Sequence, residues 1–280
     1  MPFNDPKTWT HDTADIRREE MKREQSPASF FFSQGQALIL AGAYFCDNRL
    51  DSSSRGGVAA KHRHRIRLAL FGQLMASLEF LLKDFVAKVV DAVPTFDESL
   101  LKADWLRVDA ARILSMRSAA TTAGALLLHP TMGWQNPEQV NKRYSALFGA
   151  GPIDSQEIPD LEKLWVLRHS VAHNAGFVTA YDAARAGMPD LAASVADIDQ
   201  QFLEESFDVL CQIARRTAEK VGDVVLLRWL KTRKAAGPDY TRDKDVYRTL
   251  KLLGTYVSSR AQDLPKVGKG MYTRDFSRAK

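Results

Sequence analysis

A chain of 280 residues that is 45% hydrophobic and 26% charged, with a net charge of +5, has the composition of a soluble globular protein that can bury a core. No apolar run approaches the roughly 18–20 residues of a membrane span, and the polar segment 1–24 lacks the hydrophobic stretch of a secretory signal, so we expect a cytoplasmic protein without membrane contact. The two cysteines, Cys46 and Cys211, exclude a disulfide framework and a cysteine-based zinc site.

The N-terminal part combines a polar leader, residues 1–29, with an apolar stretch at 37–45 that predicts a first core helix. Serine and glycine predict a loop over 51–60. The longest predicted helix follows at about 64–90, where Phe71, Leu74, Leu78 and other apolar residues recur at helical spacing until Pro94.

Further helical patterns separated by polar loops occur at 98–119, 137–148, 159–174, 198–233 and 243–259. Residues 177–181 are the one short strand candidate. The sequence therefore predicts an all-α helical bundle with additional N- and C-terminal helical segments. We divide it into a polar leader with a first helix (1–60), a helical domain (61–235) and a basic C-terminal extension (236–280).

Charge is unevenly distributed along the chain. Residues 228–280 hold 14 lysines and arginines against 5 acidic residues, a net of +9, whereas residues 153–223 hold 6 against 13, a net of −7. A basic end suits a polyanion such as RNA. The alternative is a solvated tail that only keeps the protein soluble. The basic run 61–67 does not have the spacing of a zinc site.

The helix predicted over 159–174 carries an arginine among its apolar residues. Pro159 suits a first helical turn and Gly176 suits a C-terminal stop. At 100° per residue, Arg168 falls within the stripe formed by Leu161, Leu164, Trp165, Val171 and Ala172. A charge that faces the core needs a partner, a ligand or a solvated cleft. Two interpretations of Arg168 stay open. It forms a structural ion pair, for which Glu79 is the candidate carboxylate, or it lies at the floor of an anion-binding cleft.

His173 lies five residues after Arg168, which is about 7.5 Å along and about 140° around a straight helix. Side chains so far apart converge on one phosphate only if the helix end is distorted or if two copies of the helix pair in a dimer. A histidine near a helix C-terminus also has a purely structural explanation, because the helix dipole favours its cation there.

The pattern Arg168-x-x-x-x-His173, followed by Asn174-x-Gly176, resembles the signature of the HEPN superfamily of helical ribonucleases and nucleotide-binding domains. The long helix with Leu78-Glu79 looks like the first core helix of that superfamily, which often carries an acidic residue facing the site. Residues 139–149 are similar to the helix that often precedes the motif. The resemblance covers about residues 64–180 and implies a HEPN-like helical bundle.

The resemblance implies a metal-independent endoribonuclease without a cofactor, acting as a toxin or antiviral defence effector with a composite site in a homodimer. Arg168 and His173 would be catalytic, with Glu79, His169 and Asn174 in support. The implied partners are RNA and an antitoxin or defence-system protein. Some HEPN toxins are modified on a tyrosine two residues after the histidine; Ala175 stands there, so we do not expect that control.

Two alternatives remain. The superfamily contains members that have lost catalysis, so the chain could be a silent module that binds RNA or a protein partner. It could also be a helical interaction protein in which Arg168 and Glu79 form only a structural ion pair.

Overall fold

The computed structural model describes residues 27–49, 57–93, 96–106, 122–127, 134 and 136–235. Helix accounts for 83% of them, and the sheet consists of two short strands, so the predicted all-α fold class is confirmed. The α-helices are α2 (Pro27–Gly42), α3 (Gly57–Ala92), α4 (Asp97–Leu101), α6 (Ala123–Leu127), α7 (Pro137–Phe148), α8 (Ile158–Asn174), α9 (Ala180–Arg185), α10 (Gln200–Arg216) and α11 (Gly222–Ala235).

Shorter elements connect these helices. The 3-10 turns are Asp104–Leu106, Ser155–Glu157 and Pro189–Leu191, and π-helical turns span Ala43–Arg49 and Thr217–Val221. Strands β1 (Phe177–Val178) and β2 (Ser194–Val195) pair antiparallel, with Phe177 opposite Val195.

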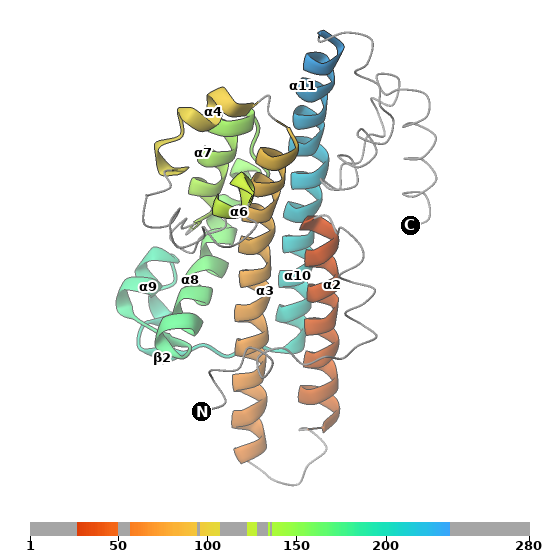
Figure 1. Cartoon of the computed structure of the whole chain (residues 1–280). Coiled ribbons are helices and arrows are strands. Elements are labelled where there is room, and N and C mark those ends of the chain that lie inside the picture. Colours follow the sequence, from red (N-terminus) through yellow and green to blue (C-terminus); the bar gives the residue numbers. More distant parts are fainter. Residues whose placement is uncertain are drawn as a thin grey trace, which may run out of the picture.

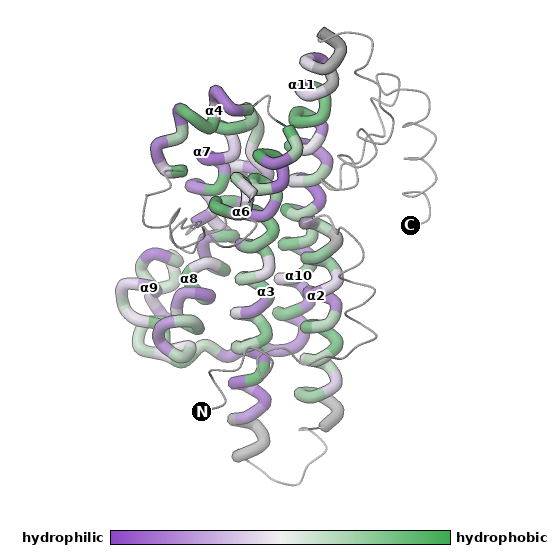
Figure 2. The backbone as a smooth tube through the Cα atoms, viewed as in Figure 1, coloured by the Kyte–Doolittle hydropathy of each residue, from purple (hydrophilic) through white to green (hydrophobic). Residues whose placement is uncertain are grey.

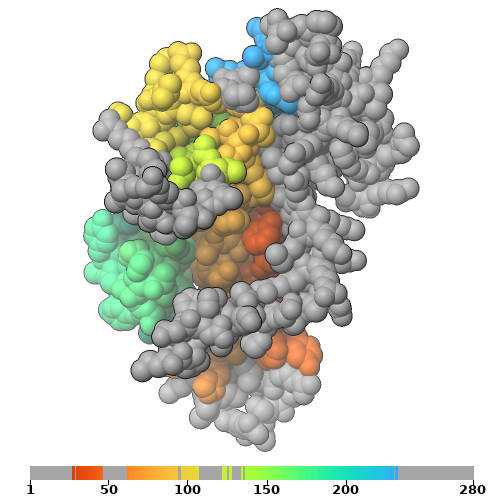
Figure 3. Space-filling model, viewed as in Figure 1, coloured from red at the N-terminus to blue at the C-terminus, as the bar shows by residue number. Residues whose placement is uncertain are grey.

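Helix α3 is the central element of the bundle. Figure 1 shows α2 and α10 along one side of it and α7 and α8 along the other. α3 packs against α2, α8 and α10, and α11 continues α10 through the π-helical turn. Figure 3 shows α4 and the segment around α9 at the surface on the α7–α8 side.

The core follows the helical spacing of α3. Its apolar side chains recur every three or four residues, and those that are 1% exposed or less are Phe71, Leu74, Met75, Leu78, Leu81, Leu82, Phe85, Val86 and Val89. Figure 2 shows hydrophilic and hydrophobic residues alternating along the coloured part of this helix, with hydrophilic residues at the lower end of that part. The hydroxyl of Tyr144 in α7 donates to the Leu82 carbonyl at 2.7 Å, so the packed aromatic ring also has a polar partner.

The core also includes α2. Phe31 is fully buried and its ring lies 5.9 Å from that of Phe207 in α10. Residues on both sides of position 60 therefore belong to one hydrophobic cluster, and position 60 itself lies inside α3.

Several element boundaries differ from the predicted ones. The first helix begins at Pro27 rather than near residue 37, and α3 begins at Gly57, inside the predicted loop. Good helix formers at 59–61 extend α3 toward its N-terminus. The predicted 198–233 helix is interrupted by the π-helical turn.

The strand candidate 177–181 shortens to Phe177–Val178, because Thr179 caps α9. The predicted helix 243–259, most of 98–119, the leader up to residue 26 and the extension 236–280 lie outside the described residues.

Candidate functional site

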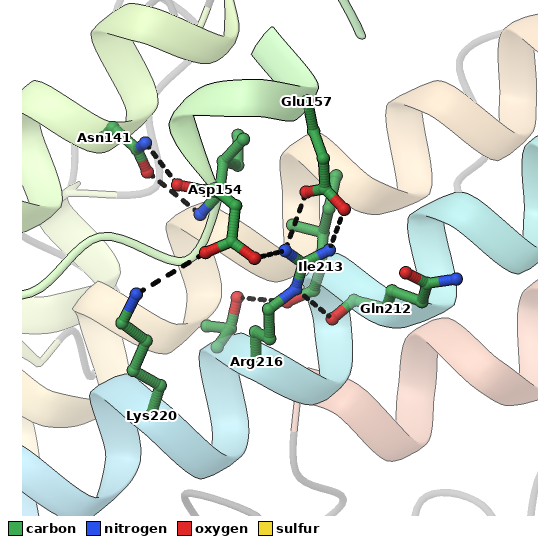
Figure 4. A network of polar contacts seen from close by, with 9 residues as sticks. Asn141, Asp154, Glu157, Gln212, Ile213, Arg216 and Lys220 are labelled. Carbon is green, nitrogen blue, oxygen red and sulfur yellow. Dashed lines mark hydrogen bonds and ion pairs between the residues drawn. The ribbon is translucent and has the colours of Figure 1, made fainter. Parts of the chain in front are cut away.

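The N-terminal end of the motif helix α8 is fixed to the other side of the bundle. Arg216 of α10 pairs with Asp154 at 2.6 Å and with Glu157 at 2.7 Å, just before α8 begins (Figure 4). The neighbouring carboxylates raise the pKa of Arg216, mainly through its hydrogen bond to Glu157. Asn141 of α7 holds the same loop by two hydrogen bonds to the backbone of Ile153. These contacts set the position at which α8 starts.

The C-terminal end of α8 stops as predicted. Ala175 and Gly176 have φ values of 51° and 87°, in the left-handed region. The backbone N–H groups of both residues donate to the carbonyl of Ser170, which satisfies an acceptor at the helix end. A β-carbon added at Gly176 would lie 2.8 Å from Cδ1 of Leu68. Glycine therefore both ends the helix and lets the chain approach α3.

The apolar stripe of α8 faces α3 for most of its length. Leu161 and Trp165 are buried, and Leu164 and Val171 are half-buried against the core. The indole of Trp165 donates to the Trp134 carbonyl at 3.2 Å. Ala172 is exposed, so its assignment to the buried stripe was wrong.

Arg168 contacts the carboxylate nominated from the sequence. Its Nη2 lies 3.2 Å from both oxygens of Glu79 in α3, and the two side chains are 28% and 15% exposed. Burial raises the pKa of Glu79, and the positive charges of Arg168 and Lys83 only partly oppose that shift. Desolvation of this carboxylate thus outweighs the attraction of its neighbours.

Two cations near this pair were not singled out from the sequence. Burial lowers the pKa of Lys83, one turn after Glu79, with further lowering from Arg168 and Arg143. Burial also lowers the pKa of Arg143 in α7. The Glu79-x-x-x-Lys83 spacing, which places both side chains on one face of α3, was the available signal for Lys83. Arg143 could be found only from the packing of α7.

His173 and His169 form an exposed pair on α8. Their ring centroids are 4.7 Å apart, at an interplanar angle of 46°. α8 remains helical through Asn174, so the distortion that would turn His173 toward Arg168 is not present. Within one chain, the two motif residues project about 140° apart, as expected for a straight helix.

Asn174 is directed toward α9. Its amide lies 3.5 Å from Oδ2 of Asp182, a buried carboxylate that also accepts from the Thr179 hydroxyl at 2.8 Å. In this arrangement Asn174 ties the end of α8 to the start of α9. In the part of the chain that is described, it forms no hydrogen bond with the ring of His173.

The predicted basic regions have different environments. In the run 61–67, His64 pairs with Asp197 at 2.7 Å and Arg67 is buried. Of the predicted basic end, residues 228–235 belong to α11, and the rest lies outside the described structure. The described residues contain no group of three or more histidine, cysteine, aspartate or glutamate side chains that could hold a metal ion.

None of the helices in the described ranges has the length and apolar character needed to cross a membrane. Comparisons of the chain with protein-family models, with curated proteins and with solved structures gave no match.

Proposed function

We propose that the chain is a metal-independent endoribonuclease of the HEPN type, acting as a toxin or antiviral defence effector. The observation that carries the proposal is the pairing of Arg168 with Glu79 on a helix that also presents an exposed His173 at its end. The ion pair fixes a guanidinium at the boundary between core and solvent. A fixed cation and a proton carrier on one helix are the two groups that RNA cleavage requires.

RNA supplies its own nucleophile, the 2′-hydroxyl, which attacks the adjacent phosphorus. His173 would take the proton from that hydroxyl or give one to the leaving 5′-oxygen, because imidazole exchanges protons near neutral pH. Arg168 would stabilise the charge that develops on the phosphate oxygens. The products are a 2′,3′-cyclic phosphate and a 5′-hydroxyl.

The geometry of Arg168 leaves donors available for a phosphate. The contacts with Glu79 use only Nη2, and no described residue accepts a hydrogen bond from Nε or Nη1. A guanidinium whose one edge is held by a carboxylate can offer its other nitrogen atoms in a fixed direction. Glu79 would then position Arg168 rather than react.

We further propose that the active form is a homodimer. Because Arg168 and His173 diverge on a straight α8, one chain does not place both side chains on one phosphate. A two-fold axis near α8 would bring Arg168 of one protomer toward His173 of its partner. Mixing inactive His173→Ala and Arg168→Ala proteins should then restore part of the activity, since one of the two composite sites would be intact.

The primary test is incubation of the protein with total RNA in the presence of EDTA. We expect cleavage with cyclic-phosphate ends, loss of cleavage in His173→Ala, and normal cleavage in His62→Ala, a control that removes an exposed histidine of α3. Arg168→Lys keeps the charge but loses the planar fork, so RNA binding should persist better than turnover. Cleavage that survives in His173→Ala, or that stops when EDTA is added, would contradict the mechanism.

A second candidate function is a catalytically silent helical module that binds RNA or a protein partner, such as an antitoxin. The same ion pair favours it, because a carboxylate at 3.2 Å already balances the charge of Arg168 without any ligand. A wild-type protein that binds RNA but leaves every tested RNA intact would support this function over the first.

A further inference from the structure

A polar cleft lies between α7 and the segment that joins α4 to the turn Asp104–Leu106, and its lining does not include Arg168 or His173. Its volume is about 440 Å³. The side chains that matter for recognition are Lys102, Asp104, Trp105, Gln139, Lys142 and Arg143. The cleft has an aromatic ring, an amide, and three cationic side chains but one carboxylate. This chemistry suits an anionic aromatic ligand.

The aromatic wall of the cleft is held in place. The guanidinium carbon of Arg143 lies 4.8 Å from the ring centroid of Trp105, and the ring of the buried Trp134 meets Trp105 edge-on at 5.8 Å. Trp105 itself is partly exposed. A ring braced by a cation and a second indole loses little freedom when a flat ligand stacks on it.

The cations of the cleft differ in their partners. Lys102 pairs with Glu98 at 2.6 Å. Lys142 is exposed and forms no ion pair with any residue in the described ranges. Its ammonium is therefore the group best placed to take a phosphate at the edge of the cleft.

Arg143 also connects this cleft with the motif. Its charge acts on Lys83, which lies one turn from Glu79 on α3, and Glu79 holds Arg168. Arg143 of α7 and Arg168 of α8 thus both lie near enough to act on the charge of Lys83 in α3. A bound polyanion would meet positive charge from three helices here.

We propose that this cleft binds one nucleotide of single-stranded RNA, with the base against Trp105 and its phosphate on Lys142. Stacking on an indole accepts every base, and the Gln139 amide can donate to or accept from a base edge. A duplex keeps its bases stacked inside and cannot present one to this ring. The inference rests on the proposed function for its substrate class, but it concerns binding rather than cleavage.

The test uses the full-length His173→Ala protein, so that binding is measured without cleavage. Fluorescence anisotropy with a labelled 12-nucleotide oligouridylate gives the affinity, and quenching of tryptophan fluorescence reports stacking. We expect Trp105→Leu to weaken binding by at least about fivefold and to reduce the quenching, whereas Trp105→Phe retains most of the affinity. Lys142→Gln should weaken binding and lower the log–log salt slope by about 0.7.

Lys220→Gln serves as the matched control, because Lys220 is an exposed lysine in the Thr217–Val221 turn and its partner Asp154 is 3.7 Å away. Circular dichroism and urea midpoints confirm that the variants are folded. Any of three results would overturn the proposal. Trp105→Leu could bind RNA as tightly as the parent protein, or Lys220→Gln could weaken binding as much as Lys142→Gln. The third result is that a duplex binds more tightly than the single strand. If wild type binds RNA through Trp105 but never cuts it, the result would support the binding cleft and contradict the proposed nuclease activity.

Discussion

The ion pair between Arg168 and Glu79 makes a quantitative prediction about stability. The two groups are 3.2 Å apart and mostly shielded from water. Burial raises the pKa of Glu79 despite both nearby cations, so the carboxylate loses more hydration than the pair returns. The pair is therefore expected to add little to the net stability of the fold, although breaking it from one side is costly.

The two single replacements should differ. Glu79→Met leaves Arg168 facing Lys83, two cations without the carboxylate between them, and should cost about 2.5 kcal/mol. Arg168→Met leaves Glu79 with Lys83 as a remaining partner and should cost about 1.5 kcal/mol. The double replacement removes both charges and should lie within about 1.5 kcal/mol of wild type, so the coupling between the two sites should be at least about 2.5 kcal/mol.

Urea unfolding followed by circular dichroism, with equal m-values across the set, measures these differences. The pH dependence gives a second check. Because the folded pKa of Glu79 is raised above 4.5, the folded state holds its proton more tightly. The unfolding free energy of wild type, measured relative to that of Glu79→Gln, should therefore fall as the pH rises from about 4.5 through the raised pKa. Additive single effects, or an Arg168→Met protein as stable as wild type, would refute the reasoning.

Three further predictions concern other parts of the chain. Arg216→Met removes the contacts to Asp154 and Glu157 and should cost about 2 kcal/mol of unfolding free energy, as measured by urea titration; an unchanged midpoint would show that α8 needs no such anchor. Gly176→Ala places a side chain at φ 87° and 2.8 Å from Leu68, and its thermal midpoint should fall further than that of Gly149→Ala, where φ is 78° and nothing lies within 4 Å. Burial raises the pKa of Cys211 to about 12, so its thiolate fraction at pH 8 is about a thousandfold below that of a thiol with the ordinary pKa of 9.0. Iodoacetamide should therefore react with Cys211 far more slowly than it reacts with glutathione. Comparable rates for the two thiols would contradict this environment.

The elements that local signals define could be predicted well. α7 has a capping Asn136, a first-turn Pro137 and a left-handed Gly149, and its predicted and observed bounds are the same. α8 has the equivalent proline start and glycine stop and differs by one residue. Such caps act within a few residues, so sequence alone is sufficient to find them.

Features that depend on packing between distant segments were harder to predict. Glu79 was found because a buried arginine needs a carboxylate, and α3 offered one beside its apolar stripe. Arg143 was missed, since only the folded chain brings α7 next to Lys83. The contact of Asn174 with Asp182 likewise depends on the tight turn into α9. In the proposed dimer, joint action of Arg168 and His173 would depend on a second chain, which helical spacing within one chain cannot specify.

The π-helical turn Thr217–Val221 has a consequence for how this chain tolerates insertions and deletions. A π turn holds one residue more than the α-helix it interrupts, so removing one residue there would let α10 and α11 merge into a regular helix. Everything after the deletion would then keep its helical phase relative to the bundle. The same deletion in the first turn of α10 would rotate the following side chains by about 100° and expose the buried face that contains Leu210 and Ile213. Length variation in this part of the molecule is therefore expected to concentrate at one turn.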